Sequence, residues 1–143
     1  MKPRALVVDD DDGVRYTLRG ILKRADLEVH EAASGEAALA ALAGEATFHL
    51  VITDLRMPGM DGLEALARIK RRQPKIQVVL LTGHATLEKG VEAMKRGALE
   101  FLEKPIDLSK LSEVIHKAKA EKMILVEEDT EERIREILHE KSW

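Results

Sequence analysis

The sequence contains no cysteine, has little excess charge of either sign and has no long apolar run. The absence of cysteine excludes disulfide bonds and thiolate chemistry, which fits a reducing cytosol. A formal net charge of -3 over 143 residues gives no whole-chain reason to expect binding to nucleic acid or to a membrane. The first apolar run ends at Val8, too short for a signal peptide, and no stretch approaches the roughly 20 apolar residues that span a bilayer. We therefore expect a cytoplasmic protein without membrane segments.

The composition is that of a soluble globular protein, with 45% hydrophobic and 34% charged residues. The length suits one domain with a single core and a short appendage. The pattern changes after Lys122, so we expect one domain over residues 1–122 and a helical extension or linker over residues 123–143. Asp129 and Glu132 resemble a capping box at the start of this extension. The extension could pair with a second subunit or pack back on the domain, and both alternatives stay open.

Short apolar runs alternate five times with stretches of helical periodicity. Strands are expected near residues 5–8, 28–32, 50–53, 76–81 and 101–102, and helices near residues 13–25, 34–43, 62–72, 86–97 and 108–120. Such alternation predicts an α/β fold with a doubly wound, five-stranded parallel sheet, right-handed crossovers and helices on both faces.

Polar residues follow four of the predicted strands. Asp9 and Asp10 follow the first, Asp54 the third, Thr82 the fourth and Lys104 the fifth. In such sheets the carboxyl ends of the strands gather functional groups at one edge. Carboxylates placed together repel or bind a cation, and Mg²⁺ prefers oxygen ligands. An Asp can also attack phosphorus, with a lysine and a hydroxyl stabilising the transferred group.

Each of these residues also has an ordinary interpretation when taken alone. The acidic run from Asp9 to Asp12 could be a solvated turn that caps a helix, and Asp54 could cap a turn. Thr82 could be a strand-end hydroxyl, and Lys104 a surface lysine. Because all of them fall at strand ends of one predicted sheet, the pattern favours a shared chemical site.

Four motifs together resemble the receiver domain of two-component response regulators, in particular receivers attached to nitrogen-regulation-type activators. They are Leu6–Asp10, Val51–Gly62, Leu80–His84 and Phe101–Pro105. The resemblance implies a flavodoxin-like sheet with strand order 2-1-3-4-5. It also implies a phosphoryl-accepting switch of a phosphorelay, which catalyses only its own phosphotransfer and slow dephosphorylation.

The resemblance also implies a role for each site residue. Asp54 would accept a phosphoryl group from a sensor histidine kinase or phosphotransfer protein. Asp10 and Asp54 would ligate Mg²⁺ directly, Asp9 through water, and Arg56 through its backbone carbonyl. Lys104 would pair with phosphoryl oxygens, and its peptide bond to Pro105 would be cis.

Four further residues complete the implied roles. Thr82 and Phe101 would act as the switch, Phe101 turning inward as Thr82 moves to the phosphate. Arg56 and His84 would tune the lifetime of the phosphoryl group, and we predict a fairly long-lived phosphorylated form.

The resemblance implies a phosphorylation-linked homodimer through the Thr86–Gly97 helix, the Phe101 strand and the Leu108–Ala120 helix. No GxxxxGK[ST] motif occurs, so DNA contact would require an output domain that the sequence does not contain. The chain could be a stand-alone receiver or one part of a longer protein.

Two alternative functions stay open. An aspartyl-nucleophile phosphatase or mutase usually has a second acid two residues after the nucleophile, where this chain has Arg56. A receiver-like module that binds partners without phosphorylation would not need the complete set of Asp, Thr and Lys.

Overall fold

The computed structural model describes residues 2–44, 46–57, 60–83 and 87–120. His84, Thr86 and the predicted extension over residues 123–143 lie outside the described residues.

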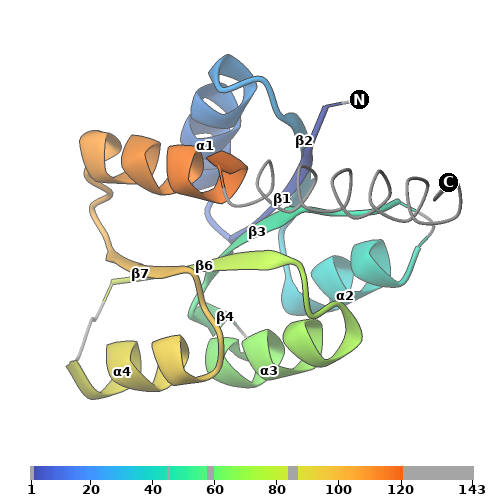
Figure 1. Ribbon diagram of the computed structural model, residues 1–143, viewed down its shortest axis with the longest axis vertical. Coiled ribbons are helices and arrows are strands. Elements are labelled where there is room, and N and C mark those ends of the chain that lie inside the picture. Colours follow the sequence, from blue (N-terminus) through green and yellow to red (C-terminus); the bar gives the residue numbers. More distant parts are fainter. Residues whose placement is uncertain (1, 45, 58–59, 84–86, 121–143) are drawn as a thin grey trace, which may run out of the picture.

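A five-stranded parallel sheet forms the centre of the molecule (Figure 1). Its strands are β1 (Arg4–Val8), β2 (Glu28–Ala32), β3 (Leu50–Asp54), β6 (Gln77–Thr82) and β7 (Glu100–Glu103). They lie in the order β2-β1-β3-β6-β7, and every neighbouring pair is parallel. In chain order this is 2-1-3-4-5, so the predicted fold class and strand order are confirmed.

Helices cover both faces of the sheet. They are α1 (Asp12–Arg24), α2 (Gly35–Ala43), α3 (Gly62–Arg72), α4 (Leu87–Lys95) and a last helix over 108–120. Figure 1 shows α1 and helix 108–120 on one side of the sheet and α2, α3 and α4 on the other. None of these described helices has the length and apolar character needed to span a bilayer.

The strands alternate their side chains between two hydrophobic clusters, one on each face. In β1, Ala5 and Val7 pack with α1 and helix 108–120, whereas Leu6 and Val8 pack with α2, α3 and α4. Successive side chains of a strand point to opposite faces, so a strand buried on both sides must be apolar throughout. This explains why the strands are short continuous apolar runs. Because the strands are parallel, their carboxyl ends lie at one edge of the sheet.

Side-chain caps set where the helices begin. Asp11 accepts from the amides of Gly13 and Val14 at the start of α1, so the cap lies within the acidic run from Asp9 to Asp12. Asp61 caps α3 by accepting from the Leu63 amide. Asp107 accepts from the amides of residues 109 and 110 at the start of helix 108–120. Helix boundaries therefore follow the polar residues between the apolar runs.

The segment after Asp54 differs from the simple loop that the sequence predicts. It contains two short antiparallel strands, β4 (Arg56–Met57) and β5 (Met60–Asp61). The Gly62 amide donates to the Leu55 carbonyl at 2.8 Å, and a Cβ on Gly62 would lie 2.6 Å from the Leu55 Cα. Only glycine therefore permits this close return of the chain, which brings the start of α3 back beside the end of β3.

Candidate functional site

The predicted site residues meet at the carboxyl edge of the sheet. Asp54 ends β3 and Thr82 ends β6, whereas Asp9 directly follows β1 and Lys104 directly follows β7. These strands are neighbours in the sheet, and the Lys104 amide donates to the Thr82 carbonyl at 2.7 Å. Residues far apart in sequence therefore form one site.

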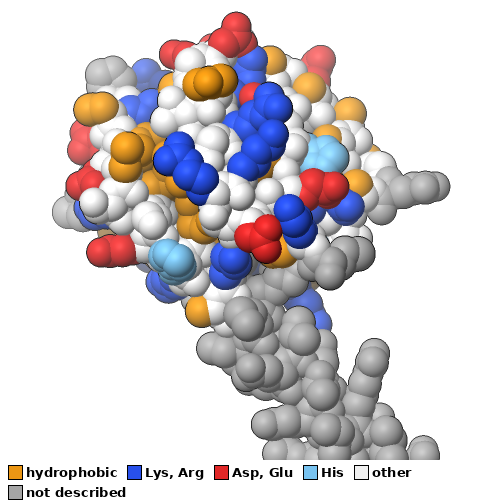
Figure 2. All heavy atoms as spheres, turned by 90° about the horizontal axis from the view of Figure 1, so that it is seen from above, with side chains coloured by type: hydrophobic (Ala, Val, Ile, Leu, Met, Phe, Trp, Pro, Cys, Tyr) orange, Lys and Arg blue, Asp and Glu red, His pale blue; other side chains and the backbone are white. Residues whose placement is uncertain are grey.

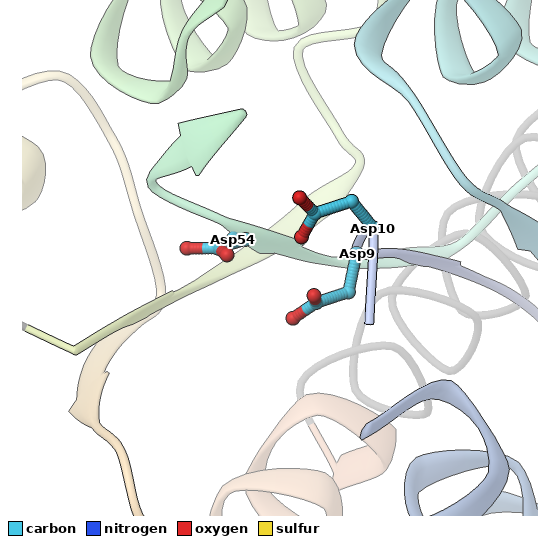
Figure 3. Close-up of side chains that lie close together, drawn as sticks. All are labelled: Asp9, Asp10 and Asp54. Atoms are coloured by element: carbon cyan, nitrogen blue, oxygen red, sulfur yellow. The ribbon is translucent and has the colours of Figure 1, made fainter. Parts of the chain in front are cut away.

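Three carboxylates form the acidic part of the site. Oxygens of Asp9, Asp10 and Asp54 all lie within 4.8 Å of one another. Figure 3 shows the three side chains beside one another at the ends of β1 and β3. Asp9 is fully buried, Asp54 is 8% exposed and Asp10 is exposed. Oxygen donors around a partly open position suit a hard divalent cation.

Lys104 holds two of these carboxylates together. Its Nζ lies 2.8 Å from Asp9 Oδ2 and 3.1 Å from Asp54 Oδ2. Burial, the largest single influence, lowers the pKa of Lys104, but the hydrogen bonds and charges of Asp9 and Asp54 together raise it above its ordinary value of 10.5. Lys104 is therefore a cation at neutral pH, and its charge makes the burial of two acids tolerable.

Backbone amides use the remaining carboxylate oxygens of Asp9 and Asp54. The amide of Arg56 donates to Asp54 Oδ1 at 3.1 Å, and the amide of Asp11 donates to Asp9 Oδ1 at 2.9 Å. Each of these two carboxylates is thus held by an ammonium on one oxygen and an amide on the other. Such restraints fix the direction in which Asp54 presents its oxygens.

The sequence and the fold were compared with those of known proteins. Residues 5–116 match the family model of the response regulator receiver domain. The chain belongs to this family. Receiver domains of two-component systems are phosphoryl-accepting signalling switches.

Two relatives show the extent of the similarity. The receiver domain is 39% identical to the DNA-binding transcriptional regulator NtrC of Salmonella typhimurium over 112 residues, covering 78% of this chain and 24% of NtrC. It is 40% identical to the transcriptional regulatory protein FixJ of Bradyrhizobium diazoefficiens over 117 residues, covering 82% of this chain and 57% of FixJ. The chain therefore spans about a quarter of the length of NtrC and little more than half of FixJ.

Solved receiver structures have the same fold. A receiver domain protein from Clostridium thermocellum superimposes with a TM-score of 0.79 at 34% identity, covering 86% of this chain and 98% of that one. The beryllofluoride-activated NtrC4 receiver domain dimer gives a TM-score of 0.78 at 33% identity, covering 82% of this chain and 97% of that one.

The predicted switch residue of the receiver domain lies on β7, with its side chain beside α4. Phe101 is partly buried, and a Cβ on Gly90 of α4 would lie 3.4 Å from its ring. The ring therefore packs directly on the backbone of α4. The adjoining Lys104–Pro105 peptide bond is cis, the isomer that the resemblance implies.

Sequence reasoning missed one residue of the receiver domain that contacts the site. Arg15, in the first turns of α1, donates to the backbone carbonyl of Asp9 at 2.5 Å and pairs with Asp12. The available signal was its helical spacing, three residues after Asp12, which places the two side chains on one face.

Proposed function

We propose that Asp54 accepts a phosphoryl group from a sensor histidine kinase or phosphotransfer protein with the help of Mg²⁺. Phosphorylation then changes a surface that binds a partner or a second copy of the chain. The observation that carries this proposal is the contact of Lys104 with both Asp9 and Asp54, within a cluster that Asp10 completes. Family membership alone would not identify the acceptor, whereas this arrangement leaves Asp54 central and nearly buried.

The donor set fits Mg²⁺. Octahedral Mg²⁺ binds oxygens at about 2.0–2.1 Å, so its ligand oxygens lie about 3–4 Å apart. The carboxylate oxygens of Asp9, Asp10 and Asp54 are already within 4.8 Å of one another. Asp10 and Asp54 would hold the ion directly and Asp9 through water, and the backbone carbonyl of Arg56 would add a fourth protein group. When bound, Mg²⁺ neutralises charge on the phosphoryl oxygens.

The chain supplies the nucleophile and the stabilising groups for transfer. An Asp54 carboxylate oxygen attacks the phosphorus of a phosphohistidine; the new O–P bond forms as the P–N bond breaks. The electron pair stays on the imidazole nitrogen, which takes a proton from solvent. Lys104 exchanges its contact with Asp54 for a phosphoryl oxygen, and the Thr82 hydroxyl donates to another.

The switch then connects the site to the surface. As Thr82 moves to the phosphate, the Phe101 ring turns inward and releases its packing against Gly90 of α4. Exposed apolar side chains on α4 and helix 108–120, namely Val91, Met94 and Leu108, mark the responding surface. The NtrC4 receiver was solved as a beryllofluoride-activated dimer, which supports a phosphorylation-linked homodimer here.

The phosphorylated form decays by slow self-catalysed hydrolysis. Arg56 and His84 shield the phosphoryl group from water, so we expect a lifetime longer than seconds. A radiolabel decay that is complete within seconds would contradict this expectation.

Three features beyond the site also belong to this proposal. Residues 1–122 form the receiver and residues 123–143 a linker or extension. The full-length relatives include DNA-binding regulators, so contact with DNA, if any, belongs to an output domain. The cytoplasmic location stays a prediction, which cell fractionation would test.

Labelling with acetyl phosphate and Mg²⁺ tests the acceptor. The wild type and Asp61→Asn should be labelled equally, because Asn still caps α3 and Asp61 lies outside the cluster. Asp54→Asn should not be labelled, and chelation of Mg²⁺ should abolish labelling of the wild type. Label on Asp54→Asn would overturn Asp54 as the acceptor, whereas steady turnover of phosphate monoesters by the wild type would favour the phosphatase alternative. Partner binding without any labelling of the wild type would favour the phosphorylation-independent module.

A further inference from the structure

Arg15 joins the acidic loop to its surroundings through the backbone. Its Nη1 donates to the Asp9 carbonyl at 2.5 Å, the same guanidinium pairs with Asp12, and its Nε lies 3.5 Å from Glu31 Oε1 on β2. The side chain is only 14% exposed. A planar guanidinium can hold several acceptors in fixed directions, so one residue ties the end of β1, the start of α1 and β2 together.

The carbonyl that Arg15 holds belongs to the peptide unit between Asp9 and Asp10. Because that unit is planar, fixing its carbonyl fixes the direction in which the main chain enters Asp10. Asp9 has further restraints: its amide donates to the Ala32 carbonyl at 3.2 Å, and both carboxylate oxygens accept hydrogen bonds. Asp10 is exposed, and no hydrogen bond to its carboxylate is found among the described residues. Its position therefore depends on the peptide that precedes it.

We propose that Arg15 is a positioning residue for Asp10, which keeps this carboxylate within the cluster that takes the cation. The inference rests on the proposed function, because it assumes that Asp9, Asp10 and Asp54 bind Mg²⁺. Lys104 restrains the buried acids from the carboxylate side, whereas Arg15 restrains the exposed one through the main chain.

Charge and positioning predict opposite effects on Mg²⁺ binding. If Arg15 acted only as a nearby positive charge, its removal would relieve repulsion and strengthen cation binding. If it positions Asp10, its removal weakens binding even though repulsion falls.

Arg19 offers a matched control. It lies one turn further along α1 and its Nη1 is 3.6 Å from Glu31 Oε2, but no contact with Asp9 is found within the part of the chain that is described. It is one of several basic residues of α1, and Figure 2 shows Lys and Arg side chains gathered on the face seen from above. Replacing it removes the same charge from the same helix.

Calorimetric titration with Mg²⁺ tests the inference on Arg15→Gln, Arg15→Lys and Arg19→Gln. At about 0.15 M salt the screening length is about 8 Å, which damps the pure charge effect. We expect Arg15→Gln to raise the Kd about tenfold, in the range seen when residues that orient metal ligands are lost. Arg19→Gln should stay within about twofold of the wild type, and Arg15→Lys should fall between the two.

The outcomes separate the inference from the proposed function. A wild type that binds no Mg²⁺ would overturn the metal site itself. A wild type that binds, with Arg15→Gln binding equally well or more tightly, would overturn the role of Arg15 alone. Circular dichroism checks folding of each variant. If Arg15→Gln does not fold, Arg15→Lys decides: weaker binding than Arg19→Gln supports positioning, and equal binding overturns it.

Discussion

Lys104 contacts two carboxylates at once, and this contact determines the charge of the site before any phosphoryl donor arrives. One positive charge lies between Asp9 and Asp54, while Asp10 stays in solvent. The ammonium offsets the repulsion between two largely buried acids. A bound cation would act on the same two groups, so Lys104 and Mg²⁺ should partly replace each other in stabilising the fold.

The variant Lys104→Met should therefore be destabilised in a way that Mg²⁺ partly reverses. We expect the free energy of unfolding to fall by about 1–3 kcal/mol without Mg²⁺, because the two acids lose a charged hydrogen-bond partner. Saturating Mg²⁺ should stabilise the variant more than the wild type. Urea unfolding followed by circular dichroism measures both changes. Lys110→Met, which alters an exposed lysine, should show neither change. A Lys104→Met protein as stable as the wild type in the absence of Mg²⁺ would contradict the stabilising role.

The raised pKa of Lys104 also predicts how stability depends on pH. A lysine whose pKa is higher in the folded state stabilises the protein fully below its unfolded value of about 10.4 and loses this effect as pH rises through the folded value. The difference in unfolding free energy between the wild type and Lys104→Met should stay level from neutral pH to about pH 10. It should shrink above the ordinary value of 10.5. Urea unfolding at a series of pH values gives this difference. A difference that instead grows as the pH rises toward 10 would mean that burial dominates and that the pKa of Lys104 is lowered in the folded state.

Single residues of the site were predictable from the sequence, but their contacts were not. Asp9, Asp54, Thr82 and Lys104 could be predicted to converge because each follows an apolar run and parallel strands end at one edge. The pairing of Lys104 with Asp9 spans 95 positions and depends on the registers of the strands between them. The backbone contact of Arg15 depends on where α1 begins, and the acidic run from Asp9 to Asp12 offers more than one start for this helix.

At the scale of elements, the tight return from β3 to α3 controls how Asp54 is presented. A short apolar run made β3 predictable, and helical periodicity made α3 predictable. The strands β4 and β5 were missed because two residues each are too few for any periodicity. Their pairing depends on the approach of Gly62 to Leu55, which no local pattern reveals.

Gly62→Ala should disrupt this return. The added Cβ would lie 2.6 Å from the Cα and the carbonyl oxygen of Leu55, and backbone atoms cannot move aside cheaply. We expect a loss of about 1–3 kcal/mol in unfolding free energy, together with slower labelling of Asp54 because β3 and its loop must shift.

Gly20→Ala is the matched control for that variant. A Cβ at Gly20 would meet only the flexible end of Arg24, at 3.4 Å, so alanine should stabilise α1 by up to about 1 kcal/mol. Thermal unfolding of both variants gives the comparison. If Gly62→Ala is as stable as Gly20→Ala, the close approach does not constrain the loop.

At the scale of the whole molecule, α4 and helix 108–120 expose apolar side chains beside β7. Met94→Glu should prevent assembly driven by beryllofluoride, because a charge would enter the contact between two α4 faces. Sedimentation velocity with and without beryllofluoride measures the change. Met94 is 46% exposed, so its replacement should leave the fold and the labelling of Asp54 intact.

Tyr16→Glu provides the comparison on a helix that does not belong to the predicted dimer surface. Tyr16 is the more exposed residue at 78% and lies on α1, across the sheet from α4. The Tyr16→Glu variant should assemble like the wild type. If Met94→Glu assembles as strongly as Tyr16→Glu, the dimer interface does not include Met94.

The order of the strands has a consequence for the synthesis of the chain. Asp9, Asp10 and Asp54 emerge from the ribosome well before β7, and Lys104 follows β7 near the end of the described sheet. A nascent chain that lacks β7 therefore holds its acids without the ammonium that joins Asp9 to Asp54 across 95 positions. The contact of Lys104 with Asp9 and Asp54 can therefore form only after residue 104 has been synthesised, so the acidic cluster is the earlier part of the site and its ammonium the last.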